Sequence, residues 1–118
     1  MKPILTFCLT LMLLQGCNSL HDEALLHGQW TTQKWIVLSS GQKINNKMDF
    51  TFNADKTYVV DYGSQDEKGS YYIAGEYLHT KETGATEKSV KIKLLTTDSL
   101  IFEMNRAGSL EQVLLLKN

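Results

Sequence analysis

The feature that most constrains the fold is an alternation of apolar and polar residues with a period of two, which recurs from about residue 29 to the end of the chain. Apolar residues stand at every second position in 48–52, 58–62 and 90–94. Such alternation is typical of strands that bury one face. It predicts strands at about 29–39, 47–53, 57–62, 69–74, 76–81, 88–95, 99–104 and 110–117.

The connections between these strands are short. Residues 53–56 and the Ala74-Gly75 pair carry turn chemistry, and residues 62–69 are predicted to form a polar loop. No gap has room for a crossover helix, so the strands should form an antiparallel meander. The first and last strands are apolar on both faces at 35–38 and 113–116, as in a closed barrel or a sandwich. Because pairing of these two strands removes both exposed edges, we expect an all-β, eight-stranded up-and-down barrel.

The composition indicates one domain and no nucleic-acid partner. A chain of 118 residues with 42% apolar residues is the size of a domain with a single core. Its 12 basic and 13 acidic residues are spread singly, so no basic stripe is present that could neutralise phosphates.

The N-terminus has the pattern of a secretory signal. The uncharged run at residues 4–14 is shorter than the roughly 20 apolar residues that a membrane-spanning helix needs, and it follows a positive start. Residues 19–22 have the spacing of a capping box, and Gly28 could end a short helical turn that closes or flanks the barrel. We expect a cleaved signal at 1–16, a tether with this turn at 17–25, and the barrel at 26–118.

The end of this run resembles the lipobox of bacterial lipoproteins in its sequence LQGC, residues 14–17. The resemblance implies that Cys17 is lipidated and becomes the first residue of the mature chain. Two or more acyl chains hold a protein stably on a bilayer, at about 0.8 kcal/mol per buried CH₂. The other cysteine, Cys8, leaves with the signal, so no disulfide is expected. The predicted location is the cell envelope, and Asn18 favours the outer membrane because Asp at this position retains some lipoproteins at the inner membrane.

A second resemblance covers residues 26–118. The stretch from Leu26 to Trp30 (LHGQW) looks like the L-x-G-x-W start of the first strand in lipocalin-like proteins. Residues 50–58, 69–73 and 100–102 are similar to small lipocalin-like lipoproteins of Bacteroidetes. The resemblance implies that Trp30 closes the lower end of the barrel. It further implies a basic residue over this tryptophan, for which Lys117 is the better match and Arg106 the weaker one.

The interior decides between two functions. An eight-stranded barrel is either filled by side chains or just wide enough for one small ligand. A ligand would be small and apolar or amphipathic, met by tyrosine hydroxyls, whereas a solid barrel would act through its surface as an accessory subunit or inhibitor. The expected inward residues are Trp30, Phe50, Phe52, Tyr58, Tyr71, Ile73, Ile92, Leu100 and Phe102. The candidate ligand-binding residues among them are Trp30, Phe50, Phe52, Tyr58, Tyr71 and Phe102.

Polar residues give no sign of catalysis or of a cofactor. His21, His27 and His79 are not at metal-ligand spacing. The oxygen-rich stretch from Asp61 to Glu67 does not match a calcium loop and is predicted to be a solvated hairpin tip. No pattern supplies a nucleophile, a base and an oxyanion hole, so no enzyme is expected.

Overall fold

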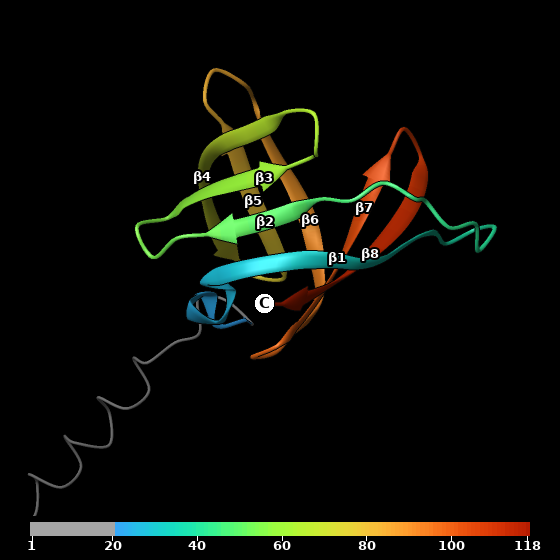
Figure 1. The fold of residues 1–118 in the computed structure, drawn as a ribbon, viewed down its shortest axis with the longest axis horizontal. Helices are drawn as coiled ribbons and strands as arrows, with labels where there is room; N and C mark the ends of the chain where they lie inside the picture. Colours follow the sequence, from blue (N-terminus) through green and yellow to red (C-terminus); the bar gives the residue numbers. More distant parts are fainter. Residues whose placement is uncertain (1–20) are drawn as a thin grey trace, which may run out of the picture.

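The computed structural model describes residues 21–118, and the predictions for the signal peptide and Cys17 lie outside this part of the chain. One short 3₁₀ helix precedes eight strands, and no described helix has the length and apolar content needed to cross a membrane. Each strand is antiparallel to the next and β8 pairs with β1, so the predicted closed barrel is confirmed (Figure 1). The elements are η1 (Glu23–Leu26), β1 (Gly28–Val37), β2 (Asp49–Phe52), β3 (Thr57–Asp61), β4 (Asp66–Ala74), β5 (Tyr77–Glu82), β6 (Glu87–Leu95), β7 (Ser99–Arg106) and β8 (Ser109–Lys117).

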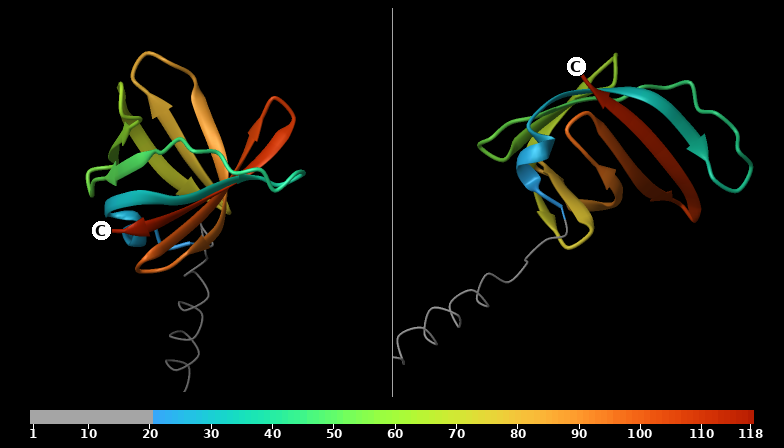
Figure 2. Two further views of the ribbon diagram at one scale, coloured as in Figure 1. Left: turned by 45° about the vertical axis from the view of Figure 1, so that its right-hand side comes forward. Right: turned by 90° about the horizontal axis from the view of Figure 1, so that it is seen from below.

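Strand β1 closes the barrel because it pairs with β8 along most of its length and with β2 only at its start. Residues 28–30 pair with β2, whereas the register with β8 runs from Trp30 opposite Lys117 to Val37 opposite Glu111. The far ends of β1 and β8, with the β7–β8 hairpin, therefore project away from β3–β5 (Figure 2). This projection leaves the barrel open at one end.

Strand β4 begins earlier than predicted. Residues 66–68 pair with residues 59–61 of β3, so the expected loop at 62–69 shrinks to 62–65. The prediction of a solvated hairpin tip is wrong for Glu67, whose exposed fraction is only 7%. The start of the strand was missed because Glu67 is charged, whereas the alternating pattern that identifies a strand has apolar residues at inward positions.

The short helix covers the opposite end, which we call the closed end. Asp22 is its N-cap and accepts a hydrogen bond from the backbone N–H of Ala24 at 3.0 Å, whereas the capping-box spacing at residues 19–22 predicts an N-cap three residues earlier, so that prediction is wrong. Leu26, at the end of the helix, is fully buried. The Glu23 carboxylate accepts the backbone N–H of Ile73 at 2.9 Å, which ties η1 to β4. Of the two positions expected for the helical turn, closing or flanking the barrel, the helix takes the first.

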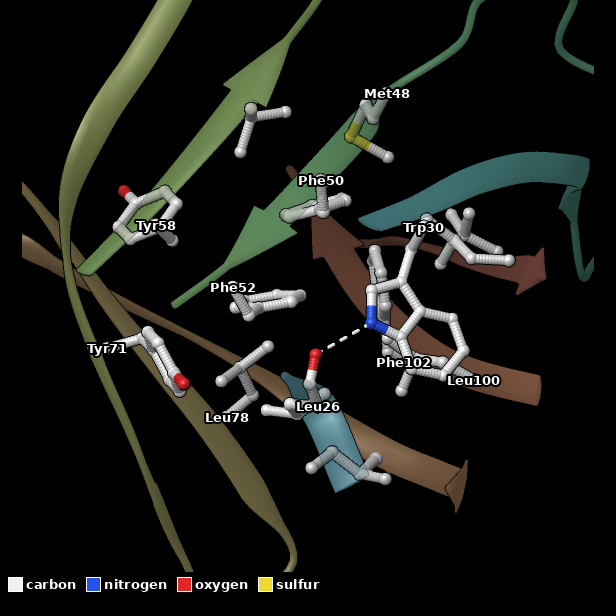
Figure 3. Packing of buried hydrophobic residues seen from close by; sticks show 14 of the residues in the cluster. Leu26, Trp30, Met48, Phe50, Phe52, Tyr58, Tyr71, Leu78, Leu100 and Phe102 are labelled. Atoms are coloured by element: carbon white, nitrogen blue, oxygen red, sulfur yellow. Dashed lines mark hydrogen bonds between the residues drawn. The ribbon is translucent and has the colours of Figure 1, made fainter. Parts of the chain in front are cut away.

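An aromatic cluster fills the interior next to the closed end (Figure 3). The rings of Phe50 and Phe52 stack with centroids 5.3 Å apart, Tyr71 meets Phe52 edge-on at 5.0 Å, and Phe102 meets Phe50 edge-on at 5.9 Å. All nine side chains that were expected to point inward are buried. The lower half of the barrel is thus ordinary packed core.

Candidate ligand-binding site

The closed end is held by Trp30, which has no exposed surface. Its indole Nε1–H donates to the carbonyl oxygen of Leu26 at 2.8 Å (Figure 3). The Lys117 ammonium lies 5.0 Å from the centre of the Trp30 ring and donates to the carbonyl of Leu25 at 3.1 Å. Lys117 is therefore the basic residue over the tryptophan, whereas Arg106 lies over the ring of Trp35 at the other end.

Above the aromatic cluster, the barrel encloses a cavity of about 100 Å³, which we call the chamber. Most of its wall is apolar, and its lining comes from strands β2 to β7, from the residue before β2 and from Tyr62 in the loop after β3. An apolar cavity of about 150 Å³ in another protein holds benzene, so this one suits a slightly smaller group. The lining residues are Met48, Phe50, Tyr58, Val60, Tyr62, Glu67, Leu78, Thr80, Lys88, Val90, Phe102 and Met104.

The chamber opens into a groove of about 860 Å³ at the open end, which we call the mouth groove. The connection from β1 to β2, the loop between β3 and β4, and the ends of β1, β6 and β7 form its walls. Its volume lies within the range of small-molecule sites. Met48, Tyr62, Lys88 and Met104 line both spaces, so the chamber and the mouth groove are continuous.

The predicted ligand-binding residues divide between the two halves of the barrel. Phe50, Tyr58 and Phe102 line the chamber, where a ligand could touch them. The other three, Trp30, Phe52 and Tyr71, are buried in the packed half and do not line it. Both alternatives for the interior are therefore partly realised, since the lower half is solid and the upper half is hollow.

A buried carboxylate, Glu67, stands at the boundary of the chamber and the mouth groove. The hydroxyls of Tyr58 and Tyr62 donate to its two oxygens at 2.5 and 2.8 Å, and the Lys88 ammonium lies 3.3 Å away. Burial raises the pKa of Glu67, but the two hydroxyls and the charge of Lys88 outweigh burial and lower the pKa below its ordinary value. Burial and the nearby carboxylate raise the pKa of both tyrosines, so they remain donors.

A second buried carboxylate, Glu111, organises the other side of the open end. Its Oε1 accepts the indole N–H of Trp35 at 2.8 Å and pairs with the Arg106 guanidinium at 3.3 Å. The guanidinium also lies 5.8 Å from the centre of the Trp35 ring. Three strands, β1, β7 and β8, are thereby joined at the rim of the mouth groove.

The sequence reasoning missed Glu67, Lys88 and Glu111. A usable signal was present, because Glu67 precedes buried Tyr71 by four residues and Glu111 precedes buried Val113 by two, which puts both carboxylates on the inward face of their strands. A charged residue at an inward position indicates a paired or functional group more often than a solvated one.

The polar side chains at the open end are fixed by internal hydrogen bonds and ion pairs. Within residues 21–118, no three His, Cys, Asp or Glu side chains gather as a metal site would require. His79 lies outside the barrel, where its ring stacks on Tyr72 at 4.6 Å and its Nδ1 bonds the Ser89 hydroxyl at 2.8 Å. The two carboxylates at the open end are engaged by donors, which suits a recognition site with fixed polar groups.

Comparison with known proteins assigns the chain to a family. No curated protein matches the chain. A family model described as a lipocalin-like domain matches residues 26–102, from the end of η1 to the middle of β7. The match covers more than half of the chain and all but the last strand and a half of the barrel. The chain therefore belongs to the lipocalin-like domain family.

Proposed function

We propose that the protein is a membrane-anchored binding protein of the cell envelope, which holds a small amphipathic molecule at the open end of its barrel. One observation carries the proposal: an apolar chamber inside the barrel is continuous with a mouth groove whose wall is about half polar. A molecule with an apolar end and a polar end would match both environments at once.

The volumes limit the ligand. Because a water molecule occupies about 30 Å³ in the liquid, a chamber of about 100 Å³ has the volume of roughly three waters. It suits the end of an alkyl chain or a compact ring, with the rest of the molecule in the mouth groove. A retinoid or haem buried inside the barrel would have to displace the stacked pair Phe50 and Phe52, which costs packing energy.

The anchor belongs to the same proposal and rests on the lipobox resemblance at residues 14–17. Lipidated Cys17 would be separated from Asp22, the cap of η1, by residues 18–21. A fully extended chain of this length spans at most about 18 Å. The closed end would then stay beside the membrane, and the mouth groove would face away from it, with the outer membrane favoured by Asn18.

Ligand binding is tested with Cys17→Ser protein, which lacks the acylation site. Fatty acids of increasing length, small aromatic acids, retinol and haem are titrated while the fluorescence of Trp35, a residue of the mouth groove, is followed. Compact molecules should give a saturable change. Val90→Phe, which fills the chamber, should abolish it, and Val59→Phe on the outer face of β3 should not. The absence of any saturable change, together with no retained molecule in native mass spectrometry, would contradict the proposal.

Anchoring is tested by labelling with palmitate. The wild type should incorporate the label and sediment with membranes, Cys17→Ser should do neither, and the matched variant Cys8→Ser should behave as the wild type because Cys8 lies in the cleaved signal. A Cys17→Ser protein that stayed in the membrane fraction, with an unlabelled wild type, would refute the lipid anchor.

An exposed aromatic group favours a second candidate function, in which the outer surface binds a protein as an accessory subunit or inhibitor. Tyr72 and Tyr77 are 40% and 45% exposed beside His79 on the outer face of β4 and β5. Tyrosine is enriched at protein interfaces. A partner captured from detergent extract by the wild type and by Val90→Phe, but not by Tyr72→Ser/Tyr77→Ser, would support this function over ligand binding.

A further inference from the structure

We infer that the ligand is a compact amphipathic carboxylate, with its apolar group in the chamber and its anionic group bound by Lys88 and Arg106. This inference rests on the proposed function and adds the charge of the ligand. The polar groups at the open end keep unused hydrogen-bond donors after their internal bonds are made.

Glu67 already accepts hydrogen bonds on both of its carboxylate oxygens. Each of its oxygens accepts a tyrosine hydroxyl, from Tyr58 or Tyr62, and one of them also accepts the Lys88 ammonium. A ligand donor group placed at Glu67 would therefore have to displace one of these partners. Displacement would leave a buried tyrosine hydroxyl or the ammonium without its bond, which makes a cationic or donor-only ligand unfavourable.

The capacity to donate hydrogen bonds is largely unused. An ammonium carries three N–H donors and a guanidinium five. Lys88 makes one hydrogen bond, to Glu67, and Arg106 makes one, to Glu111, among the contacts of the described residues. Both side chains line the mouth groove, so several charged donors face the same space. A carboxylate accepts such donors in pairs, especially from the planar fork of arginine.

The orientation of the two ion pairs also favours an anionic ligand. In the pair Lys88–Glu67 the side chains are 57% and 9% exposed, and in Arg106–Glu111 they are 56% and 9% exposed. In both pairs the carboxylate lies beneath and the cation faces the groove. The buried carboxylates hold the cations in place, and an anion entering the groove would meet the positive ends without breaking either pair.

The apolar group of the ligand has a defined position. The ring of Phe102, the side chain of Leu78 and the ring of Phe50 line the chamber beneath Lys88. These side chains come from three strands and are fixed by the core. A short alkyl end in this space would bury apolar surface while the carboxylate of the ligand remained at the rim.

The experiment compares molecules that share one short alkyl group and differ in charge: pentanoate, pentanol and pentylamine. Affinity for the Cys17→Ser protein is measured by calorimetry and by fluorescence. Since a charge-assisted hydrogen bond contributes about 1.5–3 kcal/mol, the acid should bind roughly ten-fold to a hundred-fold more tightly than the alcohol. The amine should bind most weakly.

Variants assign the effect to the two cations. Lys88→Met/Arg106→Met should reduce the affinity for the acid at least about ten-fold, to near that of the alcohol. The matched double variant Lys68→Met/Lys93→Met removes the same charge from exposed positions and should leave affinity unchanged. Circular dichroism and thermal unfolding of all variants establish that each remains folded.

The outcomes separate this inference from the proposed function. If the alcohol or the amine binds as tightly as the acid, and Val90→Phe abolishes that binding, the inference is overturned and the proposed function stands. An acid preference that survives in Lys88→Met/Arg106→Met also overturns the inference. If none of the three molecules binds, the inference is overturned, and the wider titration described above decides the proposed function separately.

Discussion

Replacing Trp30 with phenylalanine tests how the closed end is held. The substitution keeps an aromatic ring on β1 but removes the indole N–H that donates to Leu26 at 2.8 Å. It also weakens the attraction of the Lys117 ammonium, 5.0 Å from the centre of the ring. Both losses act on the contact between η1 and the barrel, so Trp30→Phe should destabilise the whole domain.

The magnitude follows from these two contacts. The carbonyl of Leu26 is left buried without its donor, which costs about 1–3 kcal/mol. Weakening the cation–π contact with Lys117 costs about 0.5–1 kcal/mol. The free energy of unfolding should therefore fall by about 2–4 kcal/mol, and the midpoint of thermal unfolding by roughly 10–20 °C for a domain of this size.

The assay is urea and thermal unfolding of the Cys17→Ser protein with and without Trp30→Phe. Lys34→Ala, at an exposed position on the same strand, is the control and should change stability by less than about 0.5 kcal/mol. A double-mutant cycle with Lys117→Met should give a coupling energy of about 0.5–1 kcal/mol. A Trp30→Phe protein as stable as the control would refute the role given to this contact.

Two further predictions concern β4. Gly69→Ala should lower the free energy of unfolding in urea by about 1–3 kcal/mol or more, because the added Cβ would lie 1.9 Å from the backbone oxygen of Lys81. The control Ser70→Ala, at the exposed neighbouring position, should lower it far less. Equal losses in the two variants would contradict this packing. Glu67→Gln should change how the stability of the protein depends on pH. The carboxyl pKa of Glu67 is below its ordinary value of 4.5 in the folded protein, so its stabilising contribution is present above that pH and is lost as the pH falls through the lowered pKa. The stability difference between wild type and Glu67→Gln should thus be largest near neutral pH and shrink in acid, while a difference that grew in acid would show that the sign is wrong.

The fold was predictable because its signals are local. Alternating residues identify the faces of the strands, and short connections leave hairpins as the only way to join them. The start of β4 was not predictable in this way, because Asp66, Glu67 and Lys68 resemble a loop in composition. Pairing with β3 and burial against two tyrosines, both tertiary effects, decide that these residues form a strand.

The candidate site was predictable only in part. Large inward residues follow from the alternation, and Lys117 over Trp30 follows from the resemblance to lipocalin-like proteins. The division of the interior into a packed half and a chamber could not be predicted, because a cavity depends on how side chains from several strands meet. The pair Arg106–Glu111 lies within the β7–β8 hairpin, whereas Lys88–Glu67 joins residues 21 positions apart, and only the barrel brings the two pairs to one rim.

The pairing of β1 with β8 also has a consequence for how the protein acquires its structure. The hydrogen bond from Trp35 to Glu111 spans 76 positions of the chain, and that from Lys117 to Leu25 spans 92. Contacts between such distant segments form slowly, because a long loop must be ordered before they stabilise anything. Until residues 109–117 have been synthesised, β1 and β7 each keep an edge that can pair with another chain. The growing chain thus keeps two open strand edges until β8 has been synthesised, and β8 both completes the barrel and ends that exposure to aggregation.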